Sequence, residues 1–167
     1  METQTQHAFV SALKDILDPQ SIVLADQAEP YLNDIQNMGA PCLLVARPST
    51  TEDVSAVVKL CHAHNIAIVS QGGNTNVCGM AVPLEGQTAI VLSLARMNRI
   101  IDINPSGFTA TVEAGVVMQN LQDAALAVDR VFAPDWGARG TATLGGAVAT
   151  NGSAKMSCAM ARRANKF

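Results

Sequence analysis

The stretch CLLVARPSTTEDVSAVVKLCHAHNIAIVSQGGN, residues 42–74, decides the fold of this chain. Its outer parts, CLLVARP and IAIVS, are short apolar runs that are typical of buried strands. The segment between them predicts a helix, with Ser49 or Thr50 as the N-cap. An acidic residue, Glu52 or Asp53, then completes a capping box. A strand, a helix and a second strand with short connections form a right-handed parallel unit.

The segments on either side have a different character. Upstream, apolar residues recur at helical spacing and predict an amphipathic helix that ends before Pro19. Downstream, the runs 88–97, 99–104 and 108–115 are rich in β-branched residues and are separated by turns, which predicts an antiparallel region. The segment 117–128 again has a helical period.

These patterns predict an α+β (mixed α/β) fold with a small parallel βαβ lobe and a second, mostly antiparallel lobe. We expect an N-terminal helical segment at 1–40, the parallel lobe at 41–84, the second lobe at 85–154 and a separate tail at 155–167.

Composition excludes several classes of protein. No apolar run among the 167 residues approaches the ~18 needed to span a membrane, and the N-terminus lacks a signal-peptide pattern. The four cysteines form no C-x-x-C pair and have no histidine at zinc-ligand spacing, so we expect reduced thiols, no metal site and a cytoplasmic protein. The net charge is −3, which argues against a nucleic-acid partner although the segment 155–167 is basic.

The loop SQGGNTNVCGMAVP, residues 70–83, contains the strongest binding signal. Gly72 and Gly73 permit positive φ angles and remove Cβ atoms, so successive backbone N–H groups can turn toward one anion. The natural ligand is a phosphate or pyrophosphate. The loop is neither a P-loop nor a Rossmann turn, because it lacks a G-K-[ST] run and does not open a helix. A tight structural connection is the alternative interpretation.

A second glycine-rich stretch, GARGTATLGGAVATN, occupies residues 137–151 in the other predicted lobe. Its threonine and asparagine side chains can form hydrogen bonds, so the two stretches could hold a long diphosphate ligand between them. For Gly145 and Gly146 the alternative is close packing of a helix on a strand. Arg139 could pair with a phosphate or could be an ordinary surface residue.

The segments ARPSTTEDVSAVVKLC, VSQGGNTN, VLSLARMNRIIDINP, ATVEAGV and GARGTATLGGAVATN follow the order and spacing of a known family. Over about residues 40–151 the chain resembles the FAD-linked oxidases of the vanillyl-alcohol oxidase and p-cresol methylhydroxylase (PCMH) type. Within them it is most similar to the D-2-hydroxyglutarate and D-lactate dehydrogenase branch.

The resemblance implies a PCMH-type FAD-binding module in which 41–84 is the first subdomain and 85–154 part of the second. In such enzymes a D-2-hydroxy acid gives hydride to the flavin, and a separate acceptor removes the electrons. It implies no catalytic or metal-binding residue here. The FAD-binding candidates that it implies are Gly72, Gly73, Asn74, Thr75, Asn76, Gly79, Ala114, Gly115, Thr141, Gly145, Gly146 and Asn151.

The tail MSCAMARRANKF, residues 156–167, departs from the family. If the reading frame starts one base earlier, permitted synonymous codons for this peptide spell NELRYGTTREQV, the continuation that the resemblance implies. We therefore expect a frameshifted end and a truncated FAD-binding fragment of a D-2-hydroxy-acid dehydrogenase, inactive alone. The alternative is a stand-alone nucleotide-binding or subunit module without catalysis.

Overall fold

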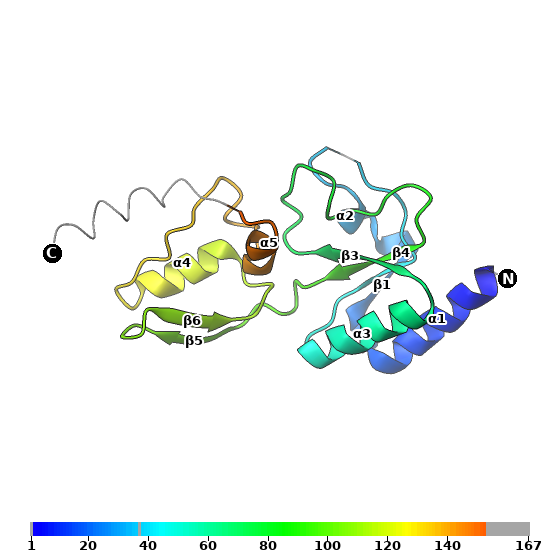
Figure 1. Cartoon of the computed structure of the whole chain (residues 1–167), viewed down its shortest axis with the longest axis horizontal. Coiled ribbons are helices and arrows are strands. Elements are labelled where there is room, and N and C mark those ends of the chain that lie inside the picture. Colours follow the sequence, from blue (N-terminus) through cyan, green and yellow to red (C-terminus); the bar gives the residue numbers. More distant parts are fainter. Residues whose placement is uncertain (1, 37, 153–167) are drawn as a thin grey trace. The chain divides into compact units, whose positions relative to one another are not determined.

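The computed structural model describes residues 2–36 and 38–152, and the predicted tail 155–167 lies outside them. The chain divides into two compact units, Met1–Met97 and Asn98–Phe167. Each unit has its own sheet, of four strands in the first and two in the second (Figure 1).

The first unit is built around the four-stranded sheet, whose strand order is β1-β2-β4-β3. Its strands are β1 (Ile22–Leu24), β2 (Leu44–Ala46), β3 (Ala67–Gln71) and β4 (Ala89–Ser93). Its α-helices are α1 (Glu2–Ile16), α2 (Glu29–Leu32) and α3 (Thr51–Ala63), and two 3-10 turns, η1 (Pro19–Ser21) and η2 (Ala25–Gln27), flank β1.

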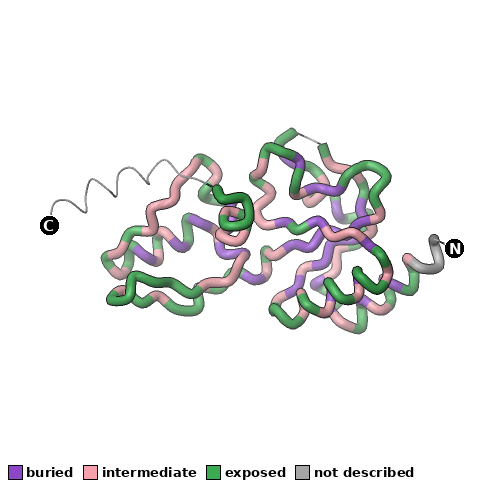
Figure 2. The backbone as a smooth tube through the Cα atoms, viewed as in Figure 1, coloured by how far each residue is buried: buried purple, intermediate pink, exposed green. Residues whose placement is uncertain are grey.

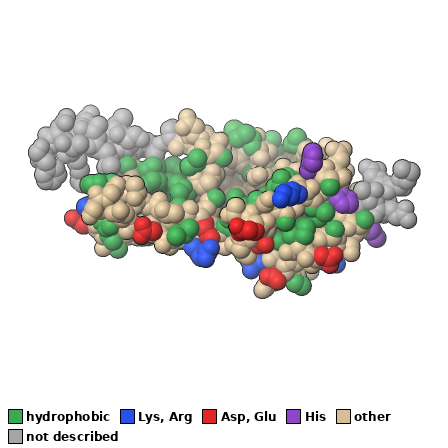
Figure 3. Space-filling model, turned by 60° about the horizontal axis from the view of Figure 1, so that its bottom comes forward, with side chains coloured by type: hydrophobic (Ala, Val, Ile, Leu, Met, Phe, Trp, Pro, Cys, Tyr) green, Lys and Arg blue, Asp and Glu red, His purple; other side chains and the backbone are tan. Residues whose placement is uncertain are grey.

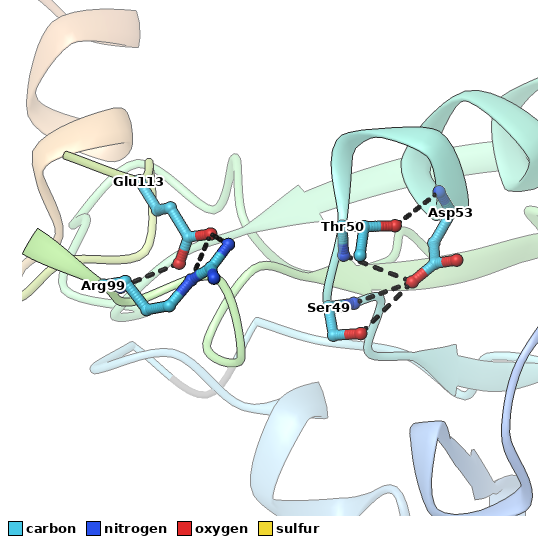
Figure 4. Close-up of polar contacts among 5 residues, drawn as sticks. All are labelled: Ser49, Thr50, Asp53, Arg99 and Glu113. Carbon is cyan, nitrogen blue, oxygen red and sulfur yellow. Dashed lines mark hydrogen bonds and ion pairs between the residues drawn. The ribbon is translucent and has the colours of Figure 1, made fainter. Parts of the chain in front are cut away.

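The predicted strand, helix and strand unit is confirmed as β2, α3 and β3. The N-cap of α3 is Thr50, whose hydroxyl accepts from the Asp53 N–H at 3.0 Å. The Asp53 carboxylate accepts in return from the backbone N–H of Thr50 at 3.2 Å and from the N–H and hydroxyl of Ser49 (Figure 4). Thr50 and Asp53 therefore form the capping box that the sequence predicted.

The placement of the run 88–97 in an antiparallel region was wrong. β4, which lies in this run, pairs in parallel with both β2 and β3 and occupies the centre of the sheet. All five of its residues are buried, as expected for a strand covered on both faces. The prediction rested on the absence of helices between the apolar runs, but β4 joins the parallel sheet after a long loop instead of a helix. The edge strand β1, antiparallel to β2, was not predicted.

The core of the first unit lies between the sheet and the helices α1 and α3. Phe9 and Leu13 of α1 and Val57 of α3 are completely buried and belong to one apolar cluster with Leu44 and Ile90 of the sheet. In Figure 2 the buried segments follow the central strands and the inner sides of these helices. The predicted amphipathic N-terminal helix is therefore confirmed.

The second unit contains the antiparallel strands β5 (Ile100–Asn104) and β6 (Thr109–Val112), as the sequence predicted. The Asn104 side chain accepts from the Gly107 N–H at 2.8 Å and closes the turn between them. At the other end of the hairpin, the Glu113 carboxylate accepts from the backbone and the guanidinium of Arg99, with a shortest distance of 2.6 Å (Figure 4). These hydrogen bonds hold the pKa of Glu113 below its ordinary value.

Two helices complete the second unit. α4 (Met118–Leu126) confirms the predicted helix, and its residues Met118, Leu121 and Ala125 are buried. α5 (Leu144–Ala149) was not predicted, because its glycines and small residues were interpreted as a loop. The fold class is confirmed as mixed, with a four-stranded mixed sheet and a two-stranded antiparallel sheet.

Candidate cofactor-binding site

The three parallel strands of the first unit end at one edge of its sheet. β3 ends at Gln71 and β4 at Ser93, and the Leu94 N–H donates to the Gln71 carbonyl at 3.0 Å. The glycine loop 72–80 leaves the sheet at this carboxyl edge, directly after Gln71. Ligands of open α/β sheets bind at such an edge. The predicted position of the loop is therefore confirmed.

The backbone of the glycine loop differs from the expectation. Its positive φ angles lie at Asn74 (50°) and Gly79 (69°), and not at Gly72 or Gly73. Asparagine tolerates this region because its short side chain forms local hydrogen bonds. A Cβ atom at Gly79 would lie 2.6 Å from the Met38 Cε, the end of a flexible side chain that can move, so the positive φ angle is the stronger reason for glycine here.

The two asparagines of the loop have different hydrogen-bond roles. Asn74 Nδ2 donates to the Asn33 carbonyl at 2.8 Å. Asn76 Oδ1 accepts from the N–H groups of Cys78 and Met80, at 3.0 and 3.1 Å. Two buried amide atoms, Asn74 Oδ1 and Asn76 Nδ2, have no partner among the residues that the structure describes. An unpartnered N–H donor fits a phosphate oxygen, whereas an unpartnered oxygen does not.

Polar residues that the sequence analysis did not select also contact this loop. The buried Gln71 donates through Nε2 to the carbonyls of Tyr31 and Ala81, at 2.9 and 2.8 Å. The exposed Gln36 donates through Nε2 to the Val77 carbonyl at 2.8 Å. The only sequence signal for Gln71 was a polar residue at the end of an apolar strand. Its partners are distant backbone carbonyls, which no sequence pattern reveals.

In the second unit, the structure brings together Ala114 and Gly145. The Gly145 N–H donates to the Ala114 carbonyl at 2.8 Å, and a Cβ at Gly145 would lie 2.8 Å from both that oxygen and the Ala114 Cβ. The packing interpretation of Gly145 is thus supported. The next residue, Gly115, is buried, whereas Gly146, Thr141 and Asn151 are exposed.

Two further polar residues in the second unit bear on the predicted site. Thr143 is buried, and its hydroxyl has no partner within the described residues. Arg139 pairs with Asp135 at 3.0 Å and is half exposed, as a surface residue would be.

The remaining reactive and charged groups within the described residues bear on thiol, metal and ionic sites. Burial raises the pKa of the Cys61 thiol to about 11, and Cys42, Cys61 and Cys78 are free. Among the described residues, no group of three His, Cys, Asp or Glu side chains could hold a metal. On the face shown in Figure 3, acidic and basic side chains are interspersed. Across residues 2–36 and 38–152, every helix is too short or too polar to cross a membrane.

Comparison with known proteins identifies the family. The sequence model of the FAD binding domain matches residues 42–162. A D-2-hydroxyglutarate dehydrogenase of Xanthomonas citri pv. viticola is 39% identical over 109 residues, which are 65% of this chain and 23% of that protein. A D-lactate dehydrogenase of Anaerostipes hadrus is 34% identical over 147 residues, 86% of this chain and 30% of that protein.

The fold comparison agrees with the sequence comparison. The crystal structure of p-cresol methylhydroxylase with substrate bound matches 89% of this chain and 29% of that protein, with a TM-score of 0.73 and 25% identity. The chain thus spans between about a fifth and a third of these relatives. This chain belongs to the FAD binding domain family of the vanillyl-alcohol oxidase and PCMH type and is homologous to the 2-hydroxy-acid dehydrogenases.

Proposed function

We propose that this chain binds FAD and that the loop 72–80 holds the cofactor's pyrophosphate. The observation that carries the proposal is the position of this loop at the carboxyl edge of the parallel strands, together with the buried Asn76 Nδ2 that has no partner. Membership of the FAD binding domain family supports it.

The residues of the loop fit this role chemically. Gly72 and Gly73 carry no side chain, so their backbone N–H groups can be approached closely by an anion. The Asn76 carboxamide adds a neutral donor, and Thr75 offers an exposed hydroxyl. FAD, when bound, supplies a two-electron acceptor for the oxidation of substrate. The residues of this chain bind and orient that group.

We further propose that the complete reaction is oxidation of a D-2-hydroxy acid, with the electrons passing to a separate acceptor. The similarity to proteins named D-2-hydroxyglutarate and D-lactate dehydrogenase supports this substrate class. Because the chain spans less than a third of either relative, we propose that it acts as the FAD-binding part and needs the remainder for turnover.

The test measures cofactor binding by the purified chain with titration calorimetry and flavin absorbance. We expect weak FAD binding, competition by ADP, and no competition by FMN, which lacks a pyrophosphate. Gly73→Val should weaken FAD binding, because a branched side chain occupies space that the anion needs. Gln87→Ala is the control, since Gln87 is an exposed residue of the same unit outside the loop.

Several results would contradict the proposal. Equal affinity in the wild type and Gly73→Val would remove the loop from the binding site. Failure of the folded chain to bind either FAD or ADP would argue against cofactor binding altogether. Reduction of FAD by D-lactate or D-2-hydroxyglutarate in the chain alone would contradict the need for the remainder.

A further inference from the structure

A segment that precedes the matched family domain runs alongside the glycine loop. Residues 31–36, which we call the strap, comprise the last two residues of α2 and the four that follow, and they precede the start of the family match at residue 42. In Figure 1 the strap follows α2 and the loop follows β3 within the same unit. Nothing in the sequence motifs predicts that these two segments meet.

Three side-chain amides join the strap to the loop and to the residue before it, each donating to a backbone carbonyl. They are Gln71 to Tyr31 at 2.9 Å, Asn74 to Asn33 at 2.8 Å, and Gln36 to Val77 at 2.8 Å. The paired residues are separated by 40, 41 and 41 positions in the sequence. The nearly constant separation means that the strap and the loop run side by side in the same direction.

The junction of this arrangement is the Gln71 carboxamide. Gln71 is 3% exposed, and its Nε2 also donates to the Ala81 carbonyl at 2.8 Å. One neutral group therefore ties together the start of the strap, the residue before the loop and the residue that follows it. Glutamine has two N–H donors, which is the number that these two carbonyls require.

The strap has its own internal brace. Asp34 is 6% exposed, and its Oδ1 accepts from the N–H groups of Gln36 and Met38, at 2.9 and 3.3 Å. This turn fixes the position of Gln36, whose side chain then reaches the loop. The backbone conformation of the strap is thus stabilised by its own hydrogen bonds, independently of its contacts with the loop.

We propose that the strap is a positioning element for the pyrophosphate loop, and that Gln71, the residue before the loop, is the principal residue that anchors it. This inference rests on the proposed function, because a loop that binds an anion through backbone N–H groups works only if those groups already converge. The strap contacts are donated by side-chain amides to backbone carbonyls, so they use none of the loop's backbone N–H groups.

The test uses the whole 167-residue chain and two readouts, amide hydrogen exchange of residues 72–80 without ligand and the FAD dissociation constant. Gln36→Ala removes one hydrogen bond from an exposed side chain, so the fold should survive. We expect exchange to rise about fivefold and FAD affinity to fall about fivefold. Gln87→Ala, another exposed glutamine of the first unit, should change neither.

Gln71→Met keeps the side-chain length and leaves two carbonyls without a donor. We expect FAD affinity to fall about thirtyfold or more. Faster amide hydrogen exchange should be confined to the loop, and the ³¹P resonance of the bound FAD diphosphate should shift. Val57→Ala, a buried residue of α3 away from the loop, lowers stability alone and should leave the ³¹P resonance unchanged.

The outcomes separate the strap from the proposed function. If FAD binds the wild type, Gln36→Ala and Gln71→Met with equal affinity, the positioning role is wrong even when amide exchange of the loop rises. If the wild type binds no FAD, the proposed function is wrong. If amide exchange of residues 72–80 is also unchanged in Gln36→Ala, the positioning role of the strap is wrong as well. If Val57→Ala reproduces both effects of Gln71→Met, Gln71 acts only through global stability and the inference is refuted.

Discussion

The contact between α5 and the turn that follows β6 predicts that alanine at position 145 destabilises the second unit. A Cβ at Gly145 would lie 2.8 Å from the Ala114 Cβ and 2.8 Å from the Ala114 carbonyl oxygen. Real Cβ atoms essentially never approach so closely, so one partner must move. The oxygen cannot move freely, because it accepts the Gly145 N–H at 2.8 Å.

The change in the free energy of unfolding is the sum of one stabilising and two destabilising effects. Alanine is favoured over glycine in a helix by up to about 1 kcal/mol. Overpacking costs about 1–3 kcal/mol, and a weakened backbone hydrogen bond adds about 1 kcal/mol. We expect Gly145→Ala to lower the free energy of unfolding by about 1–3 kcal/mol. At Gly146 a Cβ meets only the Thr143 hydroxyl at 3.3 Å, so Gly146→Ala should be neutral or slightly stabilising.

The assay uses the single tryptophan of the chain, Trp136, which lies in the second unit and is half-buried. Its fluorescence during urea unfolding should report on this unit alone. Adding Ala114→Gly to Gly145→Ala should restore only part of the lost stability, because the contact with the carbonyl oxygen remains. A Gly145→Ala variant as stable as Gly146→Ala would refute the packing argument.

Four further predictions concern other local contacts. Thr50→Ala should cost about 1 kcal/mol in chemical unfolding of the first unit, because it removes the α3 cap. Hydrogen bonds from Ser49 and Thr50 outweigh the effect of burial and lower the pKa of Asp53, so stability present above pH 3.8 should be lost as the pH falls through that lowered value. Glu113 also has a lowered pKa, because it accepts hydrogen bonds from Arg99, so the stability that it contributes should be lost as the pH falls below 4.5 through that lowered value. Glu113→Gln should remove this part of the pH dependence of unfolding, measured by Trp fluorescence. Gly79→Ala should speed exchange of the loop amides because φ is +69° there, whereas an unchanged rate would contradict the strain argument.

The sequence predicted those elements whose signals are local. The cap at Thr50 and the helical stripe that contains Val57 lie within a few residues of each other, so α3 and its flanking strands could be inferred. The parallel pairing of β4 could not, since an apolar run does not state which strands it joins.

The candidate site divides in the same way. Glycine and asparagine identified the loop, but Gln71 and the strap act through backbone carbonyls about 40 residues away. A carbonyl is common to every residue, so its use as a partner leaves no trace in the sequence. The helix α5 was missed because Gly145 disfavours a helix locally, and its close approach to Ala114 explains why glycine is nevertheless required.

The chemistry of the loop leads to a last prediction about salt. No residue between 72 and 83 carries a charge, so the proposed diphosphate contacts there are backbone N–H groups and neutral amides. Such donors lie at contact distance and are screened far less than separated charges. We expect FAD affinity to stay within about twofold over a tenfold rise in ionic strength, whereas a site of lysines or arginines should weaken steeply. Titration calorimetry at several salt concentrations measures this directly. A steep loss would show that a cation contacts the diphosphate, and Arg47, which follows β2 at the same edge and has a buried unpartnered Nε, would be the residue to replace first.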